Sequence, residues 1–212
     1  MNIYNVIILD ESGSMSSLYE QALSGMNEVL SGIRKNREDF PDQQHFVTLV
    51  TFEGEGISGV KTRLDRVAIE DIRDLTRKDY CPGGCTPLYD AMGKTLNTMD
   101  GQIQENDRVM VTIITDGYEN SSREYSGRTV KEMVGRLRKK GWTFAYIGAN
   151  QDAVEVAKEL DINNALNYEA TAAGFCEMSF KLRSAGNRFV NFCKMSEAGK
   201  APAEMNDLFD ED

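Results

Sequence analysis

Residues 4–14, YNVIILDESGS, are the stretch of sequence that decides the fold. An unbroken apolar run ends at Asp10, and a polar loop that contains Ser12 and Ser14 follows it. A short apolar run of this kind is typical of a strand that is buried on both faces, as in the middle of a parallel sheet. We therefore predict a central strand over residues 4–10 with a polar loop at its carboxyl end.

Strands and helices alternate along the rest of the chain. Apolar runs predict further strands at 45–52, 59–65, 108–116, 142–148 and 164–168, and apolar stripes at helical spacing predict helices at 17–33, 69–76, 88–99, 130–137, 151–160 and 172–195. Ser17 and Glu20 fit a capping box that begins the first helix. Residues 59–65 alternate between apolar and polar side chains after a short Gly-rich turn, which predicts an antiparallel edge hairpin. This order of elements predicts a Rossmann-like, doubly wound α/β fold with right-handed crossovers.

Length and charge restrict the class of protein. A chain of 212 residues suits one domain with one core, and no apolar run reaches the roughly 18 residues that a membrane span needs. The net charge of −10 disfavours nucleic acid and anionic membranes as partners. The N-terminus lacks the basic stretch of a signal peptide, so we expect a cytoplasmic protein. Five acids among the last nine residues predict a domain over 1–196 and an acidic flexible tail over 197–212.

Oxygen-bearing side chains gather where two predicted strands end. Asp10, Ser12 and Ser14 alternate along extended chain, so they point the same way. Asp116 ends the strand at 108–116, and it joins them if the two strands are neighbours, because ligands bind at the carboxyl ends of strands in such sheets. Mg²⁺ prefers hard oxygen ligands. Neutral hydroxyl ligands, such as those of Ser12, Ser14 and Thr86, would leave the ion electrophilic toward an outside anion.

Three motifs in this order resemble the metal-ion-dependent adhesion site of the von Willebrand factor A (vWA) family. They are Asp10-x-Ser12-x-Ser14, the segment GGCTPLYDA at 83–91, and Thr115-Asp116-Gly117. The match spans roughly residues 3–195, and Cys85 departs from it because many relatives carry a third glycine there. The resemblance implies a six-stranded, mostly parallel sheet with one antiparallel edge strand and helices on both faces. It also implies direct ligation by the hydroxyls of Ser12, Ser14 and Thr86, and mostly water-mediated ligation by Asp10 and Asp116.

We accordingly expect a non-enzymatic module that binds a protein partner through the metal. The metal is Mg²⁺ by preference, with Mn²⁺ or Ca²⁺ as alternatives, and the partner presents an Asp or Glu to it. His45 is the only histidine, and about seven strand residues at ~3.3 Å each place it far from Asp10. That distance excludes a Ser-His-Asp triad, so we predict no catalytic residue and no organic cofactor.

Several alternatives remain open at this level. A haloacid-dehalogenase-like phosphotransfer enzyme also places an Asp after its first strand, but Ser12 stands where its second Asp is expected. A scaffold with an empty metal site is a third possibility.

Individual residues near the site also have structural alternatives. Thr86 before Pro87 is also a good N-cap, and we assign Asp90 to a backbone contact instead of the metal. Tyr118, Glu119, Asn120 and Tyr125 follow Asp116 and either form the rim of the site or belong to a solvated loop. Cys81 and Cys85 are expected as free thiols, with a disulfide left open.

Overall fold

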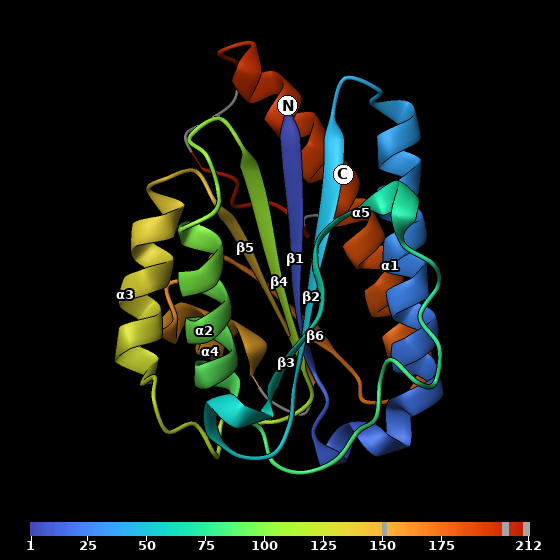
Figure 1. The fold of residues 1–212 in the computed structure, drawn as a ribbon, viewed down its shortest axis with the longest axis vertical. Coiled ribbons are helices and arrows are strands. Elements are labelled where there is room, and N and C mark those ends of the chain that lie inside the picture. The colour runs from blue at the N-terminus through green and yellow to red at the C-terminus, as the bar shows by residue number, and fades with distance from the viewer. Residues whose placement is uncertain (150–151, 201–203, 210–212) are drawn as a thin grey trace.

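Six strands form one sheet in the computed structural model, which describes residues 1–149, 152–200 and 204–209 (Figure 1). The strand order is β3-β2-β1-β4-β5-β6, and every neighbouring pair is parallel except β2 with β3. The strands are β1 (Asn2–Asp10), β2 (Gln44–Phe52), β3 (Val60–Ala68), β4 (Arg108–Thr115), β5 (Thr143–Ala149) and β6 (Asn164–Tyr168). The predicted doubly wound sheet with an antiparallel edge strand is confirmed.

Helices cover both faces of the sheet (Figure 1). The α-helices are α1 (Tyr19–Asp39), α2 (Leu88–Asp100), α3 (Gly127–Arg138), α4 (Ala153–Glu159) and α5 (Ala172–Glu197). Short 3₁₀ helices are η1 (Gly13–Leu18), η2 (Gly56–Gly59) and η3 (Ile69–Asp71). Alternate residues of β1 face opposite layers: Ile7 packs into the core under α1 and α5, and Ile8 packs into the core under α2 and α3. This two-sided burial accounts for the unbroken apolar run at the start of the chain.

Two glycines let α1 and α5 pack closely. A Cβ on Gly25 would lie 2.4 Å from Ser179 Oγ, and a Cβ on Gly32 would lie 2.9 Å from Arg183 Cγ. A larger residue at either position would push the helices apart or force the opposing side chain to move. Residue numbers rise together along the contact, so the two helices run side by side in the same direction, away from the carboxyl edge of the sheet.

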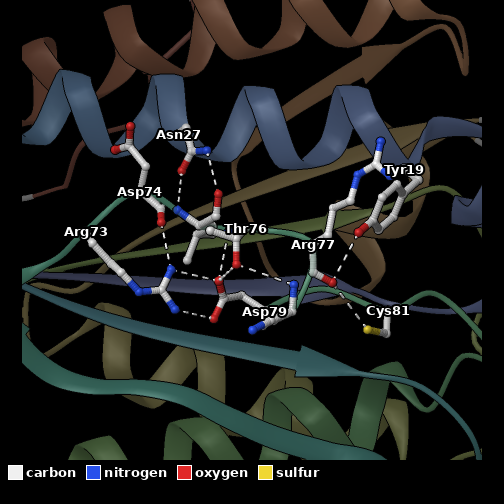
Figure 2. A network of polar contacts seen from close by, with 10 residues as sticks. Tyr19, Asn27, Arg73, Asp74, Thr76, Arg77, Asp79 and Cys81 are labelled. Atoms are coloured by element: carbon white, nitrogen blue, oxygen red, sulfur yellow. Dashed lines mark hydrogen bonds and ion pairs between the residues drawn. The ribbon is translucent and has the colours of Figure 1, made fainter.

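The predicted helix at 69–76 is wrong beyond its first turn. Only η3 is helical, and the chain then runs as an extended strap along α1 (Figure 2). Asn27 of α1 donates to the carbonyl oxygen of Leu75 at 3.0 Å and accepts from its N–H at 2.7 Å, and Arg34 donates to the carbonyl oxygen of Ile72 at 2.8 Å. These contacts satisfy backbone groups that a helix would otherwise pair internally. The three-residue spacing of apolar side chains resembled a helix because it marks the buried side of the strap.

The capping box predicted at Ser17 is also absent. The chain enters α1 through η1, the N-cap of α1 is Leu18, and no side chain caps it. Ser17 Oγ instead donates to the carbonyl oxygen of Ser14 at 3.4 Å. The 3₁₀ turn takes up the residues that would have started the helix. The predicted start of the helix at 151–160 lies outside the described residues.

Part of the predicted tail packs against the domain. Met205 and Leu208 are buried, and Asn164 at the start of β6 bonds both of their backbones: its Nδ2 donates to the carbonyl oxygen of Met205 at 3.1 Å, and its Oδ1 accepts from Leu208 N at 3.2 Å. Residues 201–203 and 210–212 of that tail lie outside the described residues. Over the part of the chain that is described, no helix is both long and apolar enough to span a bilayer.

Candidate metal centre

The five predicted ligand residues meet at the carboxyl edge of the sheet. Asp10 is the last residue of β1, and Asp116 directly follows β4. β1 and β4 are hydrogen-bonded neighbours, with Leu9 opposite Ile114. The condition on which the sequence prediction rested, that these two strands are adjacent, is therefore met.

Asp10 is fully buried and held by two donors. Its Oδ1 accepts from Ser12 N at 2.7 Å, and its Oδ2 accepts from Thr115 Oγ1 at 2.5 Å. Burial raises the pKa of Asp10 to about 6, against the lowering effect of these hydrogen bonds. Burial also raises the pKa of Asp116. Both carboxyl groups thus carry a desolvation cost that a nearby cation would relieve.

The three hydroxyls lie against the same point. Ser14 Oγ donates to Asp116 Oδ1 at 2.6 Å and lies 3.2 Å from Ser12 Oγ. A Cβ on Gly117 would lie 3.6 Å from Thr86 Oγ1 and 3.9 Å from Ser14 Oγ. Gly117 therefore brings backbone close to both hydroxyls, and the hydroxyl and carboxylate oxygens form one cluster.

Thr86 does not cap the helix that follows it. The N-cap position of α2 is Pro87, and no side chain caps that helix. The backbone of Thr86 is fixed by Asn120: its N–H donates to Asn120 Oδ1 at 2.8 Å, and its carbonyl oxygen accepts from Asn120 N at 3.2 Å. Asn120 was expected as a rim or loop residue, and it holds Thr86 in place.

The Asp10–Ser14 loop and the Cys81–Thr86 loop are joined by backbone bonds. Gly83 N donates to the carbonyl oxygen of Glu11 at 2.8 Å, and Gly13 N donates to that of Gly84 at 3.1 Å. Gly84 has a positive φ of 66°, and a Cβ there would lie 2.6 Å from Gly54 N, so only glycine fits. Tyr80 Oη also donates to the carbonyl oxygen of Asp10 at 2.7 Å.

Sequence reasoning missed the residues that support the site. Glu11 points away from the cluster as expected, but it is fully buried and accepts from Arg63 Nη2 at 2.9 and 2.8 Å. It also accepts from Cys81 N, so it links β3 to both site loops. Thr115 was quoted only as part of a motif. These contacts join residues far apart in the chain, so no local sequence pattern predicts them.

Asp90 is a structural residue, as predicted. It is fully buried and accepts from three consecutive backbone N–H groups of the loop before α3, those of Arg123 at 2.7 Å, Glu124 at 2.9 Å and Tyr125 at 2.7 Å. Glu119 similarly accepts from the backbone of Tyr89. Tyr118, the second residue after Asp116, is 59% exposed.

The donor set fits a hard divalent cation. It consists of oxygen atoms alone, and among the described residues neither Asp10 nor Asp116 forms a salt bridge with a Lys, Arg or His. Nor does the described part of the chain contain a group of three or more His, Cys, Asp or Glu that suits a metal. Any metal at this point would depend on the hydroxyls, which suit Mg²⁺ better than a soft metal ion that prefers thiolate ligands.

His45 lies at the opposite edge of the sheet. It pairs with Ile3 near the start of β1, whereas Asp10 pairs with Phe52 at the end of β2. Neither ring nitrogen of His45 has a hydrogen-bond partner within the described residues. The structure therefore places no histidine beside Ser12 or Ser14.

A family comparison agrees with the motifs. The sequence profile of the von Willebrand factor type A domain matches residues 5–119, which is more than half of the chain. This region includes all five predicted ligands. No curated protein matches this sequence significantly.

Solved structures share the fold at low sequence identity. Proximal thread matrix protein 1 from the mussel byssus was solved with a zinc-occupied metal-ion-dependent adhesion site (MIDAS) motif. It is 14% identical with a TM-score of 0.57 over 91% of this chain. The PilB minor pilin of Streptococcus sanguinis, as a D319A mutant, is 12% identical with a TM-score of 0.62 over 92%. The ArnB paralog VWA2 of Sulfolobus acidocaldarius is 15% identical with a TM-score of 0.55 over 86%. This chain spans 46%, 63% and 44% of those chains, respectively.

Proposed function

The chain belongs to the von Willebrand factor type A domain family, and from that premise we propose that it is a metal-dependent protein-binding module. In this proposal Asp10, Ser12, Ser14, Thr86 and Asp116 hold one divalent cation, Mg²⁺ by preference. A partner protein presents an Asp or Glu carboxylate to the same ion. The observation that carries the proposal is the convergence of three hydroxyls on two desolvated carboxylates that no basic side chain among the described residues neutralises.

Each residue has a distinct part in the proposed mechanism. The neutral hydroxyls of Ser12, Ser14 and Thr86 provide ligand atoms without cancelling the charge of the ion. Asp10 and Asp116 balance part of that charge, and Thr115 Oγ1 and Ser12 N keep the Asp10 carboxylate in its orientation. When bound, the cation supplies an electrophilic coordination position. Because Asp10 and Asp116 would act mostly through water, the directly bound protein ligands would be neutral hydroxyls, and the ion would attract a carboxylate from outside.

Binding is favoured over catalysis. The site places a serine hydroxyl beside a carboxylate but no histidine or lysine base, and His45 lies at the opposite edge. For phosphotransfer Asp10 would be the nucleophile, yet both of its oxygens accept hydrogen bonds and it is fully buried. No observation favours that enzyme class, so we propose a non-enzymatic role.

The zinc-occupied MIDAS motif of the mussel byssus protein supports a divalent metal at this point of the fold. The net charge of −10 favours a protein over nucleic acid as partner. The four cysteines are unpaired, which is compatible with the reducing cytoplasm that we propose as the compartment.

Calorimetric titration with Mg²⁺ and with Mn²⁺ tests the metal site. We expect wild type to bind one ion, and Ser14→Ala and Asp10→Ala to lose binding while retaining the circular dichroism of the folded protein. Ser16→Ala is the matched control, because Ser16 is an exposed neighbour outside the oxygen cluster. Unchanged affinity in both site variants would refute the proposal. A pull-down with wild type and Asp10→Ala, each with and without a chelator, then tests whether partner capture needs the ion.

A further inference from the structure

The outer face of α1 and α5 carries the most exposed large hydrophobic side chain described. Phe180 is 69% exposed, and two grooves meet at it. The first groove, about 420 Å³, lies toward the carboxyl edge of the sheet, where the candidate metal centre is, and its lining includes the exposed Cys176. The second, about 340 Å³, lies farther along the same helices and includes Asn187. Phe180 is thus the ridge between two hollows of a single face, which we call the α1–α5 face.

Charge is segregated along this face. Glu20 and Glu28 line the groove near the metal edge, and no basic residue lines it. Lys35, Arg183 and Arg188 line the second groove, and no acidic residue lines it. The α1–α5 face therefore has an acidic half and a basic half with an aromatic side chain between them.

A pattern of this kind is complementary to itself. If a second copy is laid on the face in antiparallel orientation about Phe180, Glu20 of each copy meets the basic half of the other, and Glu28, which lies level with Phe180, stays 3.6 Å from its own Arg183. Phe180 then packs on Phe180 of the partner subunit. A parallel arrangement would instead place like charges together, which is repulsive. A two-fold axis repeats each contact twice, as in most homodimers.

We propose that the chain forms an antiparallel, two-fold dimer through the α1–α5 face, with Phe180 at its centre. Several of these charges already have partners within the chain: Glu20 pairs with Arg77, Glu28 lies 3.6 Å from Arg183, and Lys35 lies 2.7 Å from Asp39. Exposed pairs of this kind contribute little to stability, so they exchange readily for contacts across an interface.

The size of the face sets the strength of the dimer. Residues 172–188 of α5 span about 25 Å, and two helices side by side are about 20 Å wide. The interface would bury about 1,000 Å² in total, which is at the low end for specific complexes. The dimer is therefore weak and concentration-dependent, and it is sensitive to salt.

The arrangement also has a consequence that rests on the proposed metal function. Because α1 and α5 both begin at the carboxyl edge of the sheet, an antiparallel dimer places its two metal sites at opposite ends. Such a dimer binds two partner carboxylates at once and favours partners that present several copies of the ligand.

Sedimentation of the full chain at increasing concentration tests the dimer. We expect a reversible monomer–dimer equilibrium that shifts toward monomer at high salt, and Phe180→Asp to weaken dimerisation at least about tenfold. Val154→Asp is the matched control, since Val154 is 56% exposed but belongs to α4 on the other layer. A wild type that stays monomeric, or a dimer that Phe180→Asp leaves unchanged, would overturn the proposal. Metal titration of Phe180→Asp separates this from the proposed function, because the metal affinity of that variant should equal that of wild type.

Cross-linking tests the orientation. In a background with Cys81→Ser and Cys85→Ser, Cys176 is the exposed thiol that remains, because Cys193 is buried. In the antiparallel dimer Cys176 lies opposite Ser184 of the partner subunit, at an interhelical distance of about 8–10 Å. A short bis-maleimide should therefore couple this protein to a copy carrying Cys176→Ser and Ser184→Cys, and should couple it poorly to itself. Efficient coupling of Cys176 to the partner's Cys176 would refute the antiparallel arrangement.

Discussion

Two regions of the molecule bury carboxylates, and they do so in different ways. Asp90 accepts from three consecutive backbone N–H groups. Asp10 accepts from only one backbone N–H and from one hydroxyl, Asp116 accepts from a hydroxyl, and burial raises the pKa of each. The first region is an internally satisfied clamp, and the second retains acceptor capacity for a ligand. Burial alone therefore does not identify a ligand residue, whereas the identity of its partners does.

The largest effect is expected in the Asp90 clamp. Asp90→Ala leaves three backbone N–H groups without their acceptor and should lower the free energy of unfolding by about 4 kcal/mol. Chemical denaturation measures this loss. Metal affinity of the folded fraction should stay within a few-fold of wild type. Loss of metal binding in a variant that remains fully folded would erase the distinction between the two regions.

The reverse result is expected at the metal site. Asp116→Asn keeps an oxygen that can accept from Ser14 but removes the charge, so Mg²⁺ affinity should fall at least about 100-fold, or about 2.7 kcal/mol. The free energy of unfolding without metal should change by less than about 1 kcal/mol, because a desolvated charge is removed. Calorimetry and denaturation on the same sample measure both quantities. A large loss of stability with unchanged affinity would make Asp116 a second clamp.

The positions of the candidate ligands were easier to predict from the sequence than those of the residues that support them. The convergence of Asp10, Ser12, Ser14 and Asp116 was predictable because strand ends and alternate positions in extended chain follow from local pattern. Their supports were missed because their partners are remote: Arg63 reaches Glu11 from β3, and Asn120 reaches Thr86 from another loop.

The same limit applies to the fold. Buried strands and the antiparallel edge followed from apolar runs and alternation. The strap after η3 did not, because Asn27 and Arg34 of α1 hold it extended. The capping box at Ser17 failed for a local reason, since a 3₁₀ turn occupies those residues.

His45 provides a third buried ionisable group, at the edge opposite the metal site. Burial lowers the pKa of His45 to about 4 from 6.5, with a further lowering by Arg37 and an opposing effect of Glu70. The unfolded chain then binds more protons between pH 6.5 and 4, so this contribution to stability is present above pH 6.5 and is lost as pH falls. We expect a loss of about 3 kcal/mol over that window.

The comparison of wild type with His45→Leu isolates this contribution. Asp10, whose raised pKa has the opposite effect between about pH 6 and its unfolded value, is present in both proteins and cancels. The unfolding free energy of wild type minus that of the variant should decrease as pH falls from 7 to 4, because only wild type loses the contribution of His45. A difference that is constant with pH would show that His45 titrates normally.

The smallest effect is expected at Tyr80, which supports the metal site without belonging to it. Tyr80→Phe removes the hydrogen bond to the carbonyl oxygen of Asp10 and should cost about 1 kcal/mol of stability. Mg²⁺ affinity should fall less than about threefold, because the carboxylate of Asp10 keeps its own two donors. Denaturation and calorimetry provide the check. A loss of affinity as large as that of Asp116→Asn would assign Tyr80 to the ligand set.

The central claim is that one divalent cation sits among the five oxygen-bearing side chains. Anomalous scattering from crystals soaked in Mn²⁺ tests it most directly. We expect a single strong peak within coordination distance of Ser12, Ser14 and Thr86, adjacent to Asp116. The absence of a peak between Ser12 and Asp116 after a soak at saturating Mn²⁺ concentration would contradict this proposal.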